Sequence, residues 1–148
     1  MAVVLKYLRY ILIHKWYVFV EYCKLGIPLM GIVHDMSKLY PSEFTAYMNN
    51  FTKPKLTGIA PNETDKTNFN YAWLYHQKAN KHHWQYWILV YDNDVNKIVC
   101  LDIPTKFRKE MLADWIGASK AINNGANKLT EWYNENKDKI MLHQNTRE

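Results

Sequence analysis

Hydrophobic side chains recur at helical spacing over most of the chain. In residues 3–24 they return every three or four positions, and Gly26 and Pro28 then supply a stop signal. Similar spacing and capping residues predict further helices over residues 28–39, 42–50, 69–84, 104–122 and 127–140. The polar stretch 52–68, rich in Pro, Thr, Asn and Lys, is predicted to be a surface loop.

One segment follows a different pattern. YWILVYDNDVNKIVCLDI has two β-prone runs around the turn residues Asp92, Asn93 and Asp94, which predicts a β-hairpin over about residues 86–103. No repeat or low-complexity stretch divides the chain, and 148 residues suit one folding unit. We therefore predict a single, mainly α domain over residues 1–148, a helical bundle with a small hairpin insertion.

Composition narrows the functional classes. The chain is 48% hydrophobic and 22% charged, which excludes intrinsic disorder, and its net charge of +5 favours an anionic partner. Cys23 and Cys100 lie far apart without a CxxC motif, so neither a disulfide framework nor a thiolate zinc site is expected. Charged side chains interrupt the apolar residues 1–22, so no membrane anchor is expected and we predict a cytoplasmic protein.

Histidine and aspartate stand where a helical bundle would place apolar residues. His14 follows an apolar run, His34 and Asp35 follow another, and Asp114 shares a predicted helix face with Met111. A buried carboxylate is costly unless it is paired or binds a metal, and a buried histidine must satisfy two ring nitrogens. One metal ion would satisfy several of these groups at once.

The order of these residues resembles the HD superfamily of metal-dependent phosphohydrolases. The resemblance implies an HD-like helical fold in which His14, His34, Asp35 and Asp114 bind a metal ion. The stretch HDMSK is similar to the HD-x-x-K form, which implies that Lys38 faces a substrate phosphate. The phrases YLRYILIHKWYVF, GIVHDMSKLYPSEF, NKHHWQYW and EMLADW also resemble a small bacterial and phage family of unknown function.

Some HD branches bind a second metal ion through a later histidine pair, and His82 and His83 resemble that pair. His76, seven residues before His83, shares its helical face and competes for the role. A mixed imidazole and carboxylate set suits one or two ions of Mn²⁺, Co²⁺, Fe²⁺, Ni²⁺ or Zn²⁺. Such an ion makes a bound water nucleophilic, and Asp35 would orient that water or accept its proton.

The resulting hypothesis is a phosphohydrolase that acts on a nucleotide or a related small phosphate ester. Its catalytic residues would be Asp35 and Lys38. Substrate binding is assigned to the following residues: Lys38, Lys81, Arg108 and Trp84.

Structural interpretations of the same residues stay open at this point. His34 and Asp35 could end a helix with a salt bridge to Lys38, and Asp114 could pair with Arg108 or Lys120 on a solvated face.

The main functional alternative is a non-enzymatic, basic and aromatic-rich module that binds nucleic acid or another protein, for example as a phage-encoded inhibitor. Its contacts would be Lys53, Lys55 and Lys66. A di-iron oxygenase on the same fold is a third hypothesis. The oligomeric state is left open by the sequence.

Overall fold

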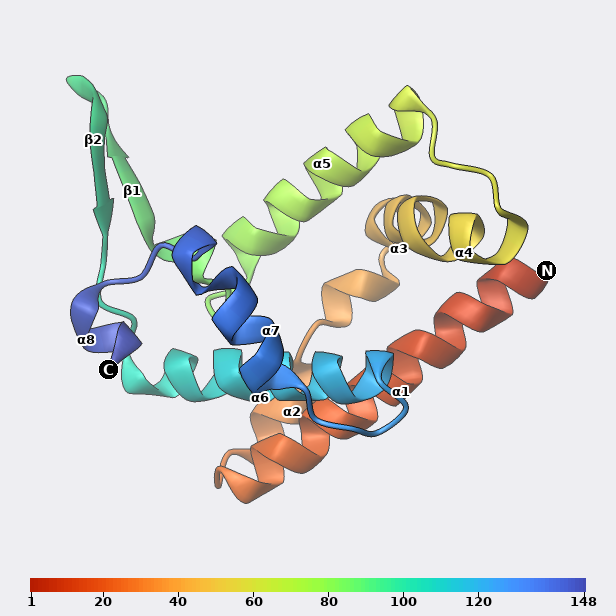
Figure 1. Ribbon diagram of the computed structural model, residues 1–148, viewed down its shortest axis with the longest axis horizontal. Helices are drawn as coiled ribbons and strands as arrows, with labels where there is room; N and C mark the ends of the chain where they lie inside the picture. Colours follow the sequence, from red (N-terminus) through yellow and green to blue (C-terminus); the bar gives the residue numbers. More distant parts are fainter.

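Two long helices that cross and pack against each other form the centre of the molecule (Figure 1). The computed structural model describes residues 1–148, the side chain at position 95 excepted. Helix α1 spans Ala2–Lys24 and helix α6 spans Thr105–Ile122. Val18 and Tyr22 of α1 and Ala113 of α6 are fully buried at this contact. Both helices lie where the hydrophobic spacing predicts them.

Gly117 of α6 allows the two helices to approach closely. A Cβ at this position would clash with Val18 Cγ2 and would lie 2.8 Å from Val18 N, both on α1. Because backbone atoms are among the close contacts, a rotamer change of Val18 alone cannot make room. Glycine is therefore required at position 117, because any larger residue would collide with the backbone of α1.

We expect Gly117→Ala to destabilise the fold by about 1–3 kcal/mol, the usual cost of overpacking a core. At an unobstructed position inside a helix, the same substitution would stabilise the fold, since alanine is favoured over glycine by about 1 kcal/mol. Urea denaturation followed by circular dichroism measures the difference. Lys109→Ala, at an exposed position of the same helix, is the control and should be near neutral. A more stable Gly117→Ala protein would contradict the close approach.

The helix predicted over residues 28–39 is interrupted. Helix α2 covers only Pro28–Val33, and a 3₁₀ turn covers Met36–Leu39. Between them, Asp35 has φ 52° and ψ 30°, in the left-handed region that aspartate tolerates better than most residues. Lys15 of α1 donates a hydrogen bond of 2.6 Å to the carbonyl of His34 and so stabilises the break. The prediction of one continuous helix was wrong at His34 and Asp35.

Residues 52–68 are mostly helical, so the predicted surface loop was also wrong. Helix α3 (Pro41–Tyr47) continues through a π-helical turn (Met48–Thr52) into α4 (Lys53–Thr57). Helix α5 (Glu63–Ala79) begins six residues earlier than predicted, because the side chain of Asn62 caps it by accepting a hydrogen bond from Asp65 N. It also ends five residues earlier than predicted.

The β-hairpin is confirmed and projects from the helices (Figure 1). Strands β1 (Ile88–Tyr91) and β2 (Asp94–Cys100) are antiparallel, with Ile88 opposite Cys100. A 3₁₀ turn over Trp84–Trp87 precedes them. The hairpin is therefore shorter than the predicted range 86–103 but lies within it.

Two shorter helices follow α6. Helix α7 (Leu129–Asn136) is shorter than the predicted helix 127–140 because a 3₁₀ turn covers Lys137–Lys139, and a short α8 spans Gln144–Arg147. The protein is mainly helical with a small two-stranded antiparallel sheet, as predicted. Among the described residues, no helix combines the length and the apolar character needed to cross a bilayer.

Candidate metal centre

The break after α2 turns two neighbouring side chains into the protein interior. His34 and Asp35 are 3% and 2% exposed. On one continuous helix they would project about 100° apart. Instead, the left-handed conformation of Asp35 separates α2 from the following 3₁₀ turn and sets the directions of both side chains.

The first cluster consists of His14 from α1, His34 and Asp35 from the break, and Asp114 from α6. One possible ligand atom from each residue lies within 4.8 Å of the others. Asp114 Oδ1 is 3.2 Å from His14 Nε2 and 3.1 Å from His34 Nε2. Asp35 Oδ2 is 3.3 Å from His34 Nε2 and 3.7 Å from His14 Nε2. We call this group the first ligand set.

The second cluster shares Asp35 and adds three histidines: His76, His82 and His83. His76 comes from α5, and the other two lie in the turn that follows it. Asp35 Oδ1 is 3.3 Å from His76 Nε2 and 3.4 Å from His82 Nε2. Asp35 thus presents one carboxylate oxygen to each cluster. We call this group the second ligand set.

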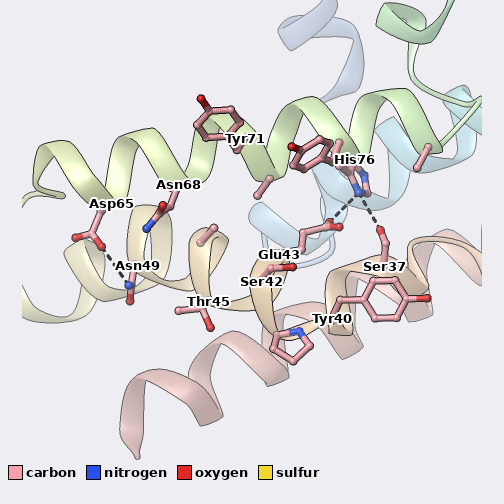
Figure 2. A pocket seen from close by; sticks show the side chains of 15 residues that line it. Ser37, Tyr40, Ser42, Glu43, Thr45, Asn49, Asp65, Asn68, Tyr71 and His76 are labelled. Carbon is pink, nitrogen blue, oxygen red and sulfur yellow. Dashed lines mark hydrogen bonds and ion pairs between the residues drawn. The ribbon is translucent and has the colours of Figure 1, made fainter.

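Carboxylates also surround the outer nitrogens of these histidines. Glu43 Oε1 lies 2.7 Å from His76 Nδ1, and Ser37 Oγ lies 3.1 Å from the same nitrogen (Figure 2). Glu110 Oε1 lies 3.4 Å from His82 Nδ1 and 3.8 Å from His34 Nδ1. Such outer partners fix the orientation of histidines that bind metals.

His34 has a further partner on its outer side. The hydroxyl of Tyr22 and His34 Nδ1 form a buried hydrogen bond of 3.1 Å. Tyr22 is fully buried in the contact between α1 and α6, so the packing of the core holds the ring of His34 in place.

Several of the inward-facing atoms lack hydrogen-bond partners. Among the described residues, buried atoms without a hydrogen bond include His14 Nε2, Asp35 Oδ1, His76 Nε2, His82 Nε2 and His83 Nε2. An unsatisfied buried polar atom costs about 1–3 kcal/mol. Several such atoms that converge on shared centres fit divalent metal ions, which would satisfy them all.

The charges of the site are strongly coupled. Burial opposes ionisation of Asp35, yet Lys38 and His34 hold its pKa well below the usual value. Burial also opposes protonation of His34, but Asp35 and Asp114 raise its pKa well above the usual value. Protons and metal ions compete for the same histidine nitrogens.

His83 differs from the other histidines. Burial, with the neighbouring His82, lowers its pKa to about 3. Its imidazole is therefore neutral near pH 7, which is the form that binds a metal ion.

Glu110 touches the outer nitrogens of histidines in both ligand sets, which leads to a prediction. We expect Glu110→Gln to weaken metal binding about 10- to 100-fold, the usual effect of removing an outer partner. Competition with a coloured chelator measures the affinity. Glu135→Gln, at an exposed position of α7, serves as the control. Unchanged affinity in Glu110→Gln would show that this carboxylate does not orient the histidines.

The structure brings together all six sequence-predicted metal ligands: His14, His34, Asp35, His82, His83 and Asp114. His76 lies in the second ligand set as well, although it was predicted only as an alternative to His83. Because α5 ends at Ala79, the following turn folds His82 and His83 back toward His76. The proposed surface pairing of Asp114 with Lys120 is not formed, since Lys120 contacts Glu21 at 2.6 Å.

The predicted substrate residues lie at different distances from this centre. Lys38 Nζ donates a hydrogen bond to Asp35 Oδ2. Arg108 donates to the carbonyl of Asn145, and the ammonium of Lys81 lies 5.6 Å from the ring centre of Phe107. Trp84 is half-buried at the start of the turn before the hairpin. For Lys81, Arg108 and Trp84, substrate binding stays a prediction.

Comparison with known proteins gives one match. The model of a family described as being of unknown function, DUF5662, matches residues 3–148. No curated protein and no solved structure matches the chain.

Proposed function

Since the chain belongs to the DUF5662 family, whose function is unknown, we propose a function from its side chains: a metal-dependent phosphohydrolase that acts on a nucleotide or a related small phosphate ester. The single observation that carries this proposal is the pair of ligand sets that share Asp35. One oxygen of Asp35 faces each set, as expected of a carboxylate that bridges two ions.

The composition of the two sets indicates the kind of metal. Together they contain two aspartates, Asp35 and Asp114, and five histidines: His14, His34, His76, His82 and His83. A mixed imidazole and carboxylate set suits Mn²⁺, Fe²⁺, Co²⁺, Ni²⁺ and Zn²⁺, whereas Ca²⁺ and Mg²⁺ prefer oxygen ligands alone. We therefore propose two transition-metal ions per chain.

When bound, two such ions supply a nucleophilic water near neutral pH and stabilise the charge that develops on a phosphoryl group. Asp35 would hold both ions at a fixed separation, since its oxygens face both sets. We therefore assign Asp35 to holding the ions in position. A role in orienting the water or accepting its proton stays a prediction. His14, His34 and Asp114 would fix the first ion.

Lys38 is the residue that we propose for phosphate binding. Its ammonium lies against Asp35 Oδ2, and 15% of its side chain is exposed. Asp35 and Asp114 raise its pKa above the usual value although burial opposes this, so the side chain stays positively charged. A phosphate oxygen next to Asp35 would meet this charge, and an ammonium is a suitable point charge for phosphate.

The test is metal analysis combined with a phosphatase screen. Protein purified without a histidine tag is stripped with a chelator and reconstituted separately with Mn²⁺, Co²⁺, Fe²⁺, Ni²⁺ and Zn²⁺. We expect two equivalents of metal per chain, and release of phosphate from 4-nitrophenyl phosphate or a nucleotide in at least one metal. The stripped protein is the control. Absence of bound metal, or bound metal without any phosphate release, would overturn the proposal.

The same samples address the alternatives. A di-iron oxygenase would show oxygen consumption and an absorbing iron centre in the Fe²⁺ sample. For the nucleic-acid hypothesis, two of the three lysines lie near acidic groups: Lys66 contacts Glu63 at 2.7 Å, and Lys53 lies 4.0 Å from Asp65. No contact in the described residues favours that hypothesis over the metal centre.

A further inference from the structure

A groove lies between α3 and α5, next to the metal centre. Its volume is about 760 Å³, within the range of pockets for small ligands. The two helices leave this space because their facing positions carry small side chains, among them Ser42, Ala46, Ala72 and Ala79. Figure 2 shows the groove from its open side, with α5 above and α3 below.

One end of the groove reaches the second ligand set. This end is lined by Ser37, Glu43 and His76. His76 lines the groove while its Nε2 lies 3.3 Å from Asp35 Oδ1. A ligand in the groove would therefore contact a proposed metal ligand directly.

The other end carries amide groups. Asn49, Asp65 and Asn68 line it (Figure 2). Along α5, at 1.5 Å per helical residue, Asn68 lies about 12 Å and Asp65 about 16 Å from His76. Asn49 donates a hydrogen bond of 3.1 Å to Asp65, whereas the side chain of Asn68 makes no hydrogen bond within the described part of the chain. An amide offers both donors and acceptors, as the edge of a nucleobase does.

The charges of the lining restrict the ligand. The described lining residues include no lysine or arginine. Both acidic residues already have partners. Glu43 contacts His76, whereas Asp65 contacts Asn49 and lies 4.0 Å from Lys53. A second or third phosphate placed in the groove would meet no lysine or arginine of the lining, and the nearby Lys53 already faces Asp65. The groove therefore suits an uncharged polar group, with an anion only at the end that reaches the second ligand set.

Aromatic rings border the groove. Tyr71 and Tyr75 line it and are 55% and 68% exposed. Their ring planes meet at 26°, with ring centres 6.4 Å apart. Exposed aromatic faces of this kind stack on planar bases.

We propose that the groove between α3 and α5 binds the nucleoside part of a nucleoside monophosphate whose phosphate lies at the metal centre, an inference that rests on the proposed function. The free amide of Asn68 contacts the base, and the rings of Tyr71 and Tyr75 border it. Nucleoside diphosphates and triphosphates are disfavoured because no lysine or arginine lines the groove.

The first test compares substrates in the metal-loaded protein. We expect higher kcat/KM for AMP, CMP, GMP or UMP than for the corresponding triphosphate. In Asn68→Ala, the ratio of kcat/KM for the preferred monophosphate to that for 4-nitrophenyl phosphate should fall roughly tenfold, the effect of one hydrogen bond of about 1.4 kcal/mol. Asn70→Ala is the matched control, since Asn70 is an exposed asparagine of the same helix outside the groove.

Two results would overturn the inference while leaving the phosphohydrolase intact. The first is that the ratio of kcat/KM for the monophosphate to that for 4-nitrophenyl phosphate is unchanged in Asn68→Ala. The second is that the protein releases phosphate but prefers triphosphates to monophosphates. A tenfold fall in Asn70→Ala as well would also count against it, since the effect would then not come from the groove.

A second measurement keeps the inference testable if no substrate is hydrolysed, in which case the proposed function fails separately. Calorimetric titration of the protein with the four ribonucleoside monophosphates gives Kd directly. Binding that is weakened about tenfold in Asn68→Ala, and also in the groove-filling variant Ala72→Leu, but not in Asn70→Ala, supports the nucleoside site. Absence of binding to the wild type overturns it. Circular dichroism checks that each variant is folded.

Discussion

Replacing Asp35 by asparagine is expected to abolish binding of both metal ions at once. Its two oxygens face different ligand sets, at 3.3 Å from His34 Nε2 and 3.3 Å from His76 Nε2. An asparagine retains one neutral oxygen and so cannot bridge two cations. Mass spectrometry should show two equivalents of metal in the wild type and none in Asp35→Asn, with loss of phosphatase activity.

The choice of asparagine follows from the backbone. Asp35 has φ 52°, and asparagine tolerates the left-handed region, whereas alanine would add about 1 kcal/mol of strain. Asp92→Asn, in the exposed turn of the hairpin, is the matched control. Full metal content in Asp35→Asn would contradict the bridging role.

The variant also leaves Lys38 without its partner, and removal of one member of a buried ion pair costs about 3–5 kcal/mol. Should the single variant fail to fold, the double variant Asp35→Asn with Lys38→Met removes both charges together and is expected to recover most of that loss. Circular dichroism establishes folding, and metal analysis of the double variant then gives the same test.

The second large effect is expected in variants that each lose only one of the two proposed ions. We expect Asp114→Asn to lose the ion of the first ligand set and His83→Ala to lose that of the second, because each residue belongs to one set only. Each variant should keep one equivalent of metal. Two-metal hydrolases stabilise both the attacking and the leaving oxygen, so each loss should lower kcat by about 100-fold or more.

Metal content and kcat are measured on the same preparations. His143→Ala, at a histidine in the C-terminal segment outside both sets, is the control for His83→Ala. If Asp114→Asn and His83→Ala both lost both equivalents, the ligand sets would form one cooperative site. If only one variant lost metal, the protein would hold a single ion, and the bridging role of Asp35 would be wrong.

The sequence predicted the long helices and the hairpin because their signals are local. The spacing of apolar residues in α1 and α6, and the turn residues between β1 and β2, are sufficient to identify these elements. The break at His34 and Asp35 has no such signal, since GIVHDMSKL contains neither proline nor glycine at that point. A contact from a distant part of the chain, the hydrogen bond from Lys15, stabilises it.

The same distinction applies to the candidate site. The types and order of His14, His34, Asp35 and Asp114 were sufficient to group them. His76 was underestimated because its relation to His83 was judged on a continuous helix, whereas α5 ends at Ala79. Neither Glu43 nor Glu110 was predicted to lie beside the histidines. Glutamate at a helix face is ordinary in a sequence, and only the fold shows that both residues are buried beside histidines.

The pairing of α1 with α6 has a consequence for synthesis of the protein. A growing chain exposes His14, then His34 and Asp35, then the later histidines, but the first ligand set lacks Asp114 until α6 has been made. The same helix supplies Glu110, which contacts histidines of both sets. Since chains are made at roughly 5–20 residues per second, several seconds separate the first histidine from Asp114. An ion that needs the complete first set could therefore bind only after translation of α6, when the ribosome has already added most of the chain.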